Sequence, residues 1–353
     1  MMRQKPTARR RKPSPGLIAL LGASALFAGN SHADYGGYAH GEVLLYSEPV
    51  SIDAAIDDWD GDFKGGEIQW AYAWAEAGVK WKQWSLGALY RHEIALLFDR
   101  DTAELYYRTE HDLPLDTGRE YRIDIEAQRF SARGLRAAWR LDPTPEFQLA
   151  IGASLFNTQH LQDGRLQGEA IGTGGDDYSF RGAIRYRYDE DHVFRHDADA
   201  PDGRGWAVDL YMRWHREDLF DVSLKIVDLL GKIHWDDAPY TNAEGFSAEG
   251  IGGLVGVMGE KDHTQDLEPR FDLNAGVTIT GPFEGKGRLL CQYGECLYGL
   301  GFGTPYTRVL YWPDTEGFEL RLGNHRYYVA LMTDDIDPKD MHSAYISFGL
   351  NLP

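Results

Sequence analysis

The sequence predicts an all-β fold, a closed antiparallel β-barrel that spans a membrane with about 14 strands, in a range of roughly 12 to 16. Three observations lead to this prediction. The chain begins with an export segment, and much of the remaining sequence alternates apolar and polar residues with a period of two. The alternating segments are also long, and their apolar faces end in aromatic residues.

Composition excludes several other classes of protein. The 353 residues include 55 acidic and 36 basic ones, 13% aromatic residues and two cysteines. The aromatic content argues against disorder, two cysteines cannot staple a disulfide-built scaffold, and a net charge of -19 makes a nucleic-acid partner unfavourable. No interior stretch has the 18 or so apolar residues of a membrane-spanning helix. The mean hydropathy of -0.45 fits a water-soluble protein. Only the distribution of apolar residues along the chain can therefore distinguish a water-soluble protein from a membrane barrel.

The first element is an N-terminal export signal. Residues 1–12 contain six basic residues and no acidic one, residues 17–29 are apolar, and Ser31-His32-Ala33 has the small residues of a cleavage site. This pattern predicts a secretory signal peptide over residues 1–33, cleaved after Ala33, which leaves one domain over residues 34–353. Because the signal peptide carries six of the 36 basic residues, the mature chain has a net charge of -25.

Export also places the two cysteines in an oxidising compartment. Cys291 and Cys296 flank a turn-like Tyr293-Gly294 pair. A redox dithiol would favour a C-x-x-C spacing, which is not present here. We therefore expect a structural disulfide between the two cysteines.

The strand pattern is clearest between Tyr121 and Gln128. Tyr121, Ile123 and Ile125 fall on one face, and charged residues, among them Asp124 and Glu126, fall on the other. The same alternation recurs in six further segments, residues 135–141, 147–155, 180–188, 206–215, 271–279 and 344–352.

The length of these segments favours a transmembrane barrel over a soluble sandwich. About 9 to 11 residues suit a tilted strand that crosses hydrocarbon, whereas ordinary strands have about five or six. Aromatic residues such as Trp206, Trp214, Phe180 and Tyr188 stand at the ends of apolar faces, as in an interfacial girdle. The sheet must close, because an open edge in lipid would leave backbone groups unpaired.

The polar faces are predicted to line a wet lumen. Arginines there could attract an anionic solute or form a charge ladder at a constriction. They could instead pair with lumenal carboxylates and stabilise the wall, and we favour this pairing because buried arginines usually find carboxylate partners. The predicted lumenal charges are Arg136, Arg140, Arg181, Arg185, Arg187, Arg213, Asp124, Glu126 and Asp209.

Acidic residues gather in the expected loops. Asp58, Asp60 and Asp62 have the spacing that starts an EF-hand, but Phe63 and Gln69 occupy positions that need glycine and glutamate. A weak, hydrated Ca²⁺ or Mg²⁺ site is the alternative to ordinary solvated acidic loops, which we expect. We predict no cofactor.

No catalytic arrangement is evident. His160 and His215 lack a serine and an orienting partner in a recognisable motif. The first functional hypothesis is therefore a passive or selectively permeable channel for small polar solutes. One alternative is an enzyme that modifies lipid or lipopolysaccharide, and another is a non-conducting structural or assembly partner of envelope or exopolysaccharide machinery.

Taken together, the export signal, the dyad-repeat strands, the aromatic girdles and the acidic loops resemble Gram-negative outer-membrane β-barrel proteins. The resemblance covers the mature chain and points to no substrate-specific family. It implies location in the outer membrane, contact with its lipid and lipopolysaccharide, and insertion by the barrel-assembly machinery. In this class the last strand commonly ends in Phe or Trp, whereas this chain alternates from Phe348 to Leu352 and ends in Pro353.

Overall fold

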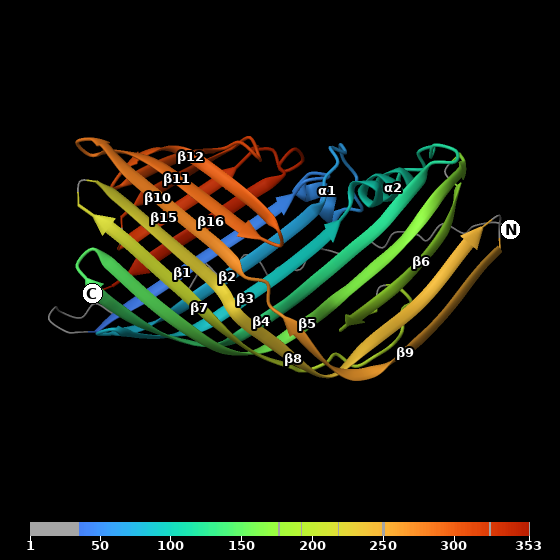
Figure 1. The fold of residues 1–353 in the computed structure, drawn as a ribbon, viewed down its shortest axis with the longest axis horizontal. Coiled ribbons are helices and arrows are strands. Elements are labelled where there is room, and N and C mark those ends of the chain that lie inside the picture. The colour runs from blue at the N-terminus through green and yellow to red at the C-terminus, as the bar shows by residue number, and fades with distance from the viewer. Residues whose placement is uncertain are drawn as a thin grey trace. The chain divides into compact units, whose positions relative to one another are not determined.

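The computed structural model describes residues 35–352 apart from 176, 192, 218, 249, 250 and 325. These residues form sixteen strands of one antiparallel sheet and two short helices (Figure 1). The predicted signal peptide over residues 1–33 lies outside the described residues. None of the helices in the described part of the chain has the length and apolar character needed to cross a membrane.

The elements follow one another in a simple order along the chain. The helices are α1 (Ile52–Ile56) and α2 (Arg100–Glu110). The strands are β1 (Tyr35–Ser47), β2 (Ile68–Trp81), β3 (Trp84–Phe98), β4 (Glu120–Thr144), β5 (Phe147–Gly174), β6 (Asp177–Tyr188), β7 (Gly203–Arg216), β8 (Phe220–Ala248), β9 (Ile251–Asp266), β10 (Arg270–Thr280), β11 (Phe283–Gln292), β12 (Glu295–Thr304), β13 (Thr307–Trp312), β14 (Gly317–Gly323), β15 (Tyr327–Thr333) and β16 (Ser343–Asn351).

The sheet closes into a barrel. The last strand β16 pairs with β1, and β8 pairs with both β7 and β10, so the ring of hydrogen-bonded neighbours is complete. β6 and β7 pair with successive parts of β5, so they share one position around the barrel. β9 and β10 pair with successive parts of β8 and share another position. The sixteen described segments therefore occupy fourteen positions around the barrel, which confirms the predicted fold class and strand number.

The two ends of the barrel differ. At one end short turns join the strands, such as the two residues between β2 and β3, and β1 begins and β16 ends there. At the other end longer loops carry α1 and α2. Because short turns face the periplasm in outer-membrane barrels, we call these ends the periplasmic and the extracellular end.

A sheet extension continues beyond the barrel at the extracellular end. β4, β5 and β8 contain 25, 28 and 29 residues, whereas β13 and β14 contain 6 and 7. In their extracellular halves β5 pairs with β6, β6 with β8, and β8 with β9. Figure 1 shows β6 and β9 at the right, beyond the strands of the barrel. β9 is almost entirely exposed.

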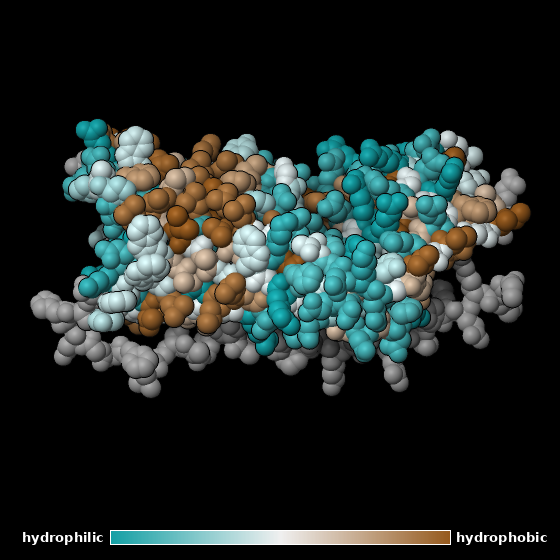
Figure 2. Space-filling view, turned by 60° about the horizontal axis from the view of Figure 1, so that its bottom comes forward, coloured by the Kyte–Doolittle hydropathy of each residue, from teal (hydrophilic) through white to brown (hydrophobic). Residues whose placement is uncertain are grey.

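The outward face of the barrel is apolar. Leu135, Leu155 and Trp206 stand in one row across β4, β5 and β7 and are 60%, 71% and 42% exposed. Near the periplasmic turns aromatic rings meet in pairs, for example Tyr35 with Trp81. Figure 2 shows the apolar surface at the left, over the barrel, and a mainly hydrophilic surface where the extension lies. This belt suits the hydrocarbon of a membrane.

A β-bulge in β5 marks the boundary between barrel and extension. The register of β4 and β5 shifts between Arg129 and Ser131, and His160 in the bulged part of β5 has a φ of 63°. An extra residue exchanges the faces of a strand, because side chains alternate with a period of two. β4 has no extra residue and pairs with β3 without a shift, so Tyr121 and Ile123 lie on the same face as Leu135. On the extension this face is covered by α2, whose Leu105 packs against Tyr121 and Ile123.

Candidate functional site: the barrel lumen

An apolar cluster fills the extracellular half of the lumen. It combines side chains from one side of the barrel wall, between β11 and β2, each with at most 7% of its surface exposed. Trp70 and Trp312 are its largest members, and both are 1% exposed. The cluster draws on β1, β2, β11, β12, β13, β15 and β16, and it fills the lumen beside this part of the wall. Its members, which we call the lumenal cluster, are Leu44, Tyr46, Ile68, Trp70, Tyr72, Leu290, Leu297, Leu310, Trp312, Met332 and Tyr345.

Some polar atoms within this cluster lack partners. The indole N–H groups of Trp70 and Trp312 and the hydroxyl of Tyr72 are buried without a hydrogen bond to any described residue. A buried polar group without a partner costs free energy. The lumenal cluster therefore offers unused hydrogen-bonding groups in the middle of an otherwise apolar barrier.

Charged side chains in the middle of the lumen form ion pairs. Arg91 is fully buried and forms hydrogen bonds with both carboxylate oxygens of Asp228, at 2.8 Å for one of them, and with Glu93 at 2.5 Å. The Arg91 guanidinium also lies 5.4 Å from the ring centre of Trp74 and 5.0 Å from that of Phe130. Arg91 is thus held by two carboxylates and by aromatic faces.

A bulge in β8 brings Asp228 to this position. Asp228 has a φ of 57°, and the β7 and β8 register shifts around Asp209. The backbone N–H of Asp228 donates to Asp209 at 3.0 Å, and Asp209 accepts from Arg136 at 2.7 Å. Arg136 also lies 3.5 Å from Glu76. The bulge therefore joins the ion pairs of Arg91 and the ion pairs of Arg136 into one network.

Four further basic side chains extend the network around the wall. Glu42 binds both Lys225, at 3.0 Å, and Arg270, at 2.7 Å. Arg288 donates to Asp272 at 2.8 and 3.0 Å. Arg288 also pairs with Glu319, which binds Arg308 as well. We call this set the ion network, and its members are Glu42, Glu76, Arg91, Glu93, Arg136, Asp209, Lys225, Asp228, Arg270, Asp272, Arg288, Arg308 and Glu319.

Polar cavities open at both ends of the lumen. The extracellular vestibule has a volume of about 690 Å³, and Tyr46 of the lumenal cluster lines it. The periplasmic vestibule has a volume of about 790 Å³, and Arg308 of the ion network lines it. The charged groups of the first are Glu48, Asp314, Glu316, Asp334, Lys64 and Arg100, and those of the second are Arg213, Arg216, Lys286, Arg308, Arg321, Glu217, Asp221 and Glu284.

Some of the predicted lumenal residues lie on the inner wall. Arg136 and Asp209 pair with each other in the ion network, and Arg213 pairs with Asp221 at 2.8 Å in the periplasmic vestibule. Arg140 lies by the turn after β4, half exposed, and pairs with Asp142 at 3.2 Å. The predicted preference for carboxylate partners thus describes the three arginines, and Asp209 is the partner of one of them.

Five of the residues predicted to be lumenal lie in the sheet extension, beyond the barrel. Asp124 and Glu126 lie on the same face of β4 as Arg136, since β4 pairs with β3 without a shift, and Asp124 pairs with Arg165 at 2.7 Å. Arg181, Arg185 and Arg187 belong to β6, which lies wholly in the extension. Phe180 packs against the cluster below α2, so these arginines lie on the opposite face of the extension from α2.

The strongest lumenal charges were not predicted. Arg91, Arg270 and Arg288 are each at most 6% exposed and each bind carboxylates. The only signal in the sequence is local: Arg91 and Glu93, two residues apart, share one face of a strand. Asp228, the other partner of Arg91, and Glu42, the partner of Arg270, lie more than a hundred residues away along the chain, so no spacing reveals them. Arg288 binds Asp272 and Glu319, which stand on other strands.

The two cysteines form a disulfide in this structure. Cys291 and Cys296 stand directly opposite each other across the hairpin of β11 and β12. The hairpin turn holds Tyr293, whose ring lies 6.2 Å from that of Trp70. The disulfide therefore constrains a turn that covers the lumenal cluster.

The loop with Asp58, Asp60 and Asp62 does not gather them into a cation site. Among the described residues, no group of three or more histidine, cysteine or acidic side chains is arranged to hold a metal ion. Trp59 is instead the buried residue of this loop and packs against Phe98 and Ala103.

A single carboxylate organises the loop between β6 and β7. Asp191 accepts hydrogen bonds from the Tyr186 hydroxyl and from the backbone N–H groups of Val193, Phe194 and His196, the last three at 2.8 to 3.1 Å. Burial by itself raises the pKa of the Asp191 carboxyl, but these hydrogen bonds outweigh burial and hold the pKa below its ordinary value.

Replacing Asp191 by asparagine is expected to speed hydrogen exchange of the 193–196 amides roughly 5- to 30-fold at pH 7, because a carboxylate accepts more strongly than an amide. A lowered pKa means that the wild-type loop is stabilised above the ordinary carboxyl pKa of about 3.9 and loses this stabilisation as the pH falls further. Mass-spectrometric exchange, corrected for intrinsic rates, measures both effects. A variant that keeps the wild-type acid dependence would contradict this role of Asp191.

Comparison with known proteins adds little beyond the fold. No protein-family model and no curated protein matches this sequence. Similar solved structures include a deletion mutant of the TodX monoaromatic hydrocarbon channel, with 9% identity, coverage of 91% of this chain and 90% of that chain, and a TM-score of 0.42. The Pseudomonas putida toluene transporter TodX has 9% identity, coverage of 90% and 88%, and a TM-score of 0.32. At such values the assignment to outer-membrane-type barrels rests on the closed strand pairing and the apolar belt of this chain.

Proposed function

We propose that this barrel is a channel for small polar solutes that is closed in this structure. The observation that carries the proposal is the pair of polar vestibules at opposite ends of one lumen, with the lumenal cluster and the ion network between them. The unpaired indole N–H groups of Trp70 and Trp312 and the Tyr72 hydroxyl give a polar solute hydrogen-bonding partners within the barrier. Passage requires these side chains to move apart.

The charges of the vestibules favour solutes without net charge. The extracellular vestibule has four acidic and two basic residues, and the periplasmic one has five basic and three acidic residues, histidines aside. An anion is repelled at the first and a cation at the second. Neutral or zwitterionic molecules meet neither barrier, so they are the proposed substrate class.

Liposome swelling tests this channel directly. Vesicles that contain the full-length protein are expected to swell faster in an isosmotic neutral sugar or a zwitterionic amino acid than in a salt of similar ion size. If these vesicles swell no faster than protein-free vesicles in any of the solutes, the proposed channel is wrong.

Replacing Arg321 by glutamine is expected to shift the residual ion preference towards cations. Arg321 lines the periplasmic vestibule, forms no ion pair with a described carboxylate and lies 4.0 Å from the Tyr328 ring centre. Its charge is therefore less compensated than that of its neighbours. Reversal potentials in a salt gradient measure the shift, and Arg140→Gln, at the same end but outside the vestibule, is the matched control.

One observation favours a second candidate, an enzyme that acts on membrane lipid. His92 stands directly opposite Ser131 across β3 and β4, and His160 lies 3.2 Å from Asp189. The Ser131 hydroxyl, however, donates to the backbone oxygen of Gln159 at 3.4 Å instead of to a histidine. Lipid turnover by the wild type that Ser131→Ala abolishes, without vesicle swelling, would favour this enzyme over the channel.

The proposed biogenesis follows from the same architecture. We propose that the segment over residues 1–33 is a cleaved export signal and that the barrel-assembly machinery inserts the chain into the outer membrane. Two features support this proposal: the alternation of β16, with Ile346 and Phe348 facing outward, and the pairing of β16 with β1. Outer-membrane lipid and lipopolysaccharide would then surround the belt.

A further inference from the structure

A polar row borders the lipid-facing belt on β4, β5 and β7. Arg133 pairs with Asn157, and Asn157 pairs with Arg204, so the three residues stand side by side on the outer face. On each strand this row lies two residues beyond the exposed row of Leu135, Leu155 and Trp206, on the extracellular side. Tryptophan concentrates where hydrocarbon meets headgroups. The polar row is therefore at the level of the headgroups of the outer leaflet.

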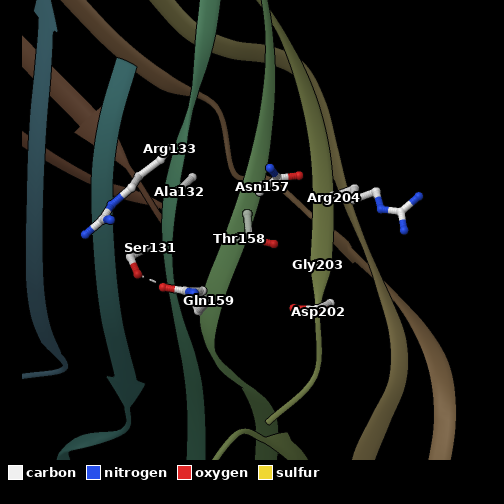
Figure 3. A pocket seen from close by; sticks show the side chains of 9 residues that line it. All are labelled: Ser131, Ala132, Arg133, Asn157, Thr158, Gln159, Asp202, Gly203 and Arg204. Carbon is white, nitrogen blue, oxygen red and sulfur yellow. Dashed lines mark hydrogen bonds between the residues drawn. The ribbon is translucent and has the colours of Figure 1, made fainter. Parts of the chain in front are cut away.

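The row contains a cavity of about 430 Å³. Figure 3 shows Arg133 and Arg204 on its two sides, with Asn157, Thr158 and Gln159 of β5 between them. The cavity lies where the wall is interrupted, because β5 stops pairing with β7 at Thr158 and starts pairing with β6 four residues later. We call it the boundary cavity.

The two arginines are available to an external anion. Arg133 is exposed, has no carboxylate partner among the described residues, and lies 5.9 Å from the Tyr90 ring centre. The Arg204 side chain is 78% exposed, and its ion pair with Asp236 has a long distance of 3.7 Å. By contrast, Arg213 binds Asp221 through two hydrogen bonds of 2.8 and 2.9 Å.

The other groups of the boundary cavity define its chemistry. Asn157 and Gln159 carry side-chain amides that can donate hydrogen bonds, and His234 stands opposite Arg204 in the next strand. Asp202 also lines the cavity and opposes an anion unless a cation bridges the two. A tetrahedral phosphate group matches two forked guanidiniums with amide donors between them.

We propose that the boundary cavity binds a phosphate group on a lipid headgroup of the outer leaflet. The Arg133 and Arg204 side chains point away from the cavity in Figure 3, so they turn towards it when each donates to the phosphate. The acyl chains lie along the apolar row of Leu135, Leu155 and Trp206. Lipid A, which carries phosphates on its sugar headgroup, has this chemistry. The site goes beyond the proposed function, since it faces the membrane and contributes no residue to the lumen.

Titration of the purified full-length barrel with lipid A in mixed micelles tests this site. The double variant Arg133→Gln/Arg204→Gln is expected to bind bisphosphorylated lipid A at least about tenfold more weakly, because two charge-assisted contacts are lost. Lipid A without phosphates is expected to bind both proteins equally. Faster migration of the unboiled protein on a gel confirms that each variant is folded.

The control variant Arg181→Gln/Arg185→Gln removes the same charge from β6 of the extension, away from the belt. Its binding is expected to match that of the wild type. Equal weakening by both double variants would reduce the effect to general electrostatic attraction and overturn the site. Inorganic phosphate that binds the wild type as tightly as lipid A does would overturn the lipid as its ligand. With Mg²⁺ present, wild-type binding should tighten if a cation bridges Asp202 to the phosphate, and a tenfold loss in the variant should persist.

Discussion

Replacing Arg91 by methionine is expected to destabilise the barrel by about 3–5 kcal/mol, because it leaves two carboxylates buried without their partner. Glu93 and Asp228 are each at most 4% exposed and both bind Arg91 directly. The Asp228 carboxyl has no second basic group with which it forms an ion pair among the described residues. Equilibrium unfolding in urea, followed by the loss of fast gel migration, measures the change.

Two further variants separate this effect from a simple loss of packing. Arg213→Gln breaks an ion pair whose side chains are 40% and 36% exposed, so it should cost at most about 1 kcal/mol. The triple variant Arg91→Met/Glu93→Gln/Asp228→Asn removes the stranded charges and should recover much of the lost stability. If the triple variant is as unstable as Arg91→Met alone, unpaired charge is not the cause.

Reading the sequence succeeds for strands of the barrel wall. Alternation with a period of two identified the barrel segments of β5, β7, β10 and β16, because each contrasts one lipid-facing row with one lumenal row. Trp206 and Trp214 face outward as predicted, and Asp209 faces inward. One physical constraint, lipid on a single face, acts on all these segments, so the pattern is readable without an alignment.

Reading the sequence fails where that constraint ends. Residues 121–128 alternate just as clearly, yet their apolar face packs beneath α2 and not against lipid. The sequence also hides the bulges near His160 and Asp228, whose effect is to exchange faces and to redirect one carboxylate. Alternation reports that one face is buried, and it does not report whether lipid or protein buries it.

Apolar residues inside the lumen also made two strands hard to predict from the sequence. Its inner row contains Trp70, Tyr72 and Trp312 as well as charges, so apolar residues occupy both faces of β2 and β13 at the extracellular half. Such strands lose the contrast between faces, which explains why neither of them was recognised. The closure of the lumen could therefore be found only from the packing.

Replacing both Trp70 and Trp312 by alanine is expected to open this closure and to raise single-channel conductance several-fold. Each indole is fully buried in the lumenal cluster, and the two stand on β2 and β13. Their removal also costs stability, about 3–5 kcal/mol for each large aromatic residue. Planar-bilayer recordings of variants that still show folded migration measure the change in conductance.

A matched control is Trp59→Ala, because Trp59 is equally buried but packs beside α1, outside the lumenal cluster. It should lose stability without gaining conductance. The Arg288 guanidinium lies 5.9 Å from the Trp312 ring, so removing this indole also takes away one support of the ion network. If the double variant folds and conducts no more than the wild type, the barrier lies in the ion network, where the paired charges of Arg288, Asp272 and Glu319 would still close the lumen. A large rise would instead place the barrier in the lumenal cluster, because those ion pairs remain available in the variant.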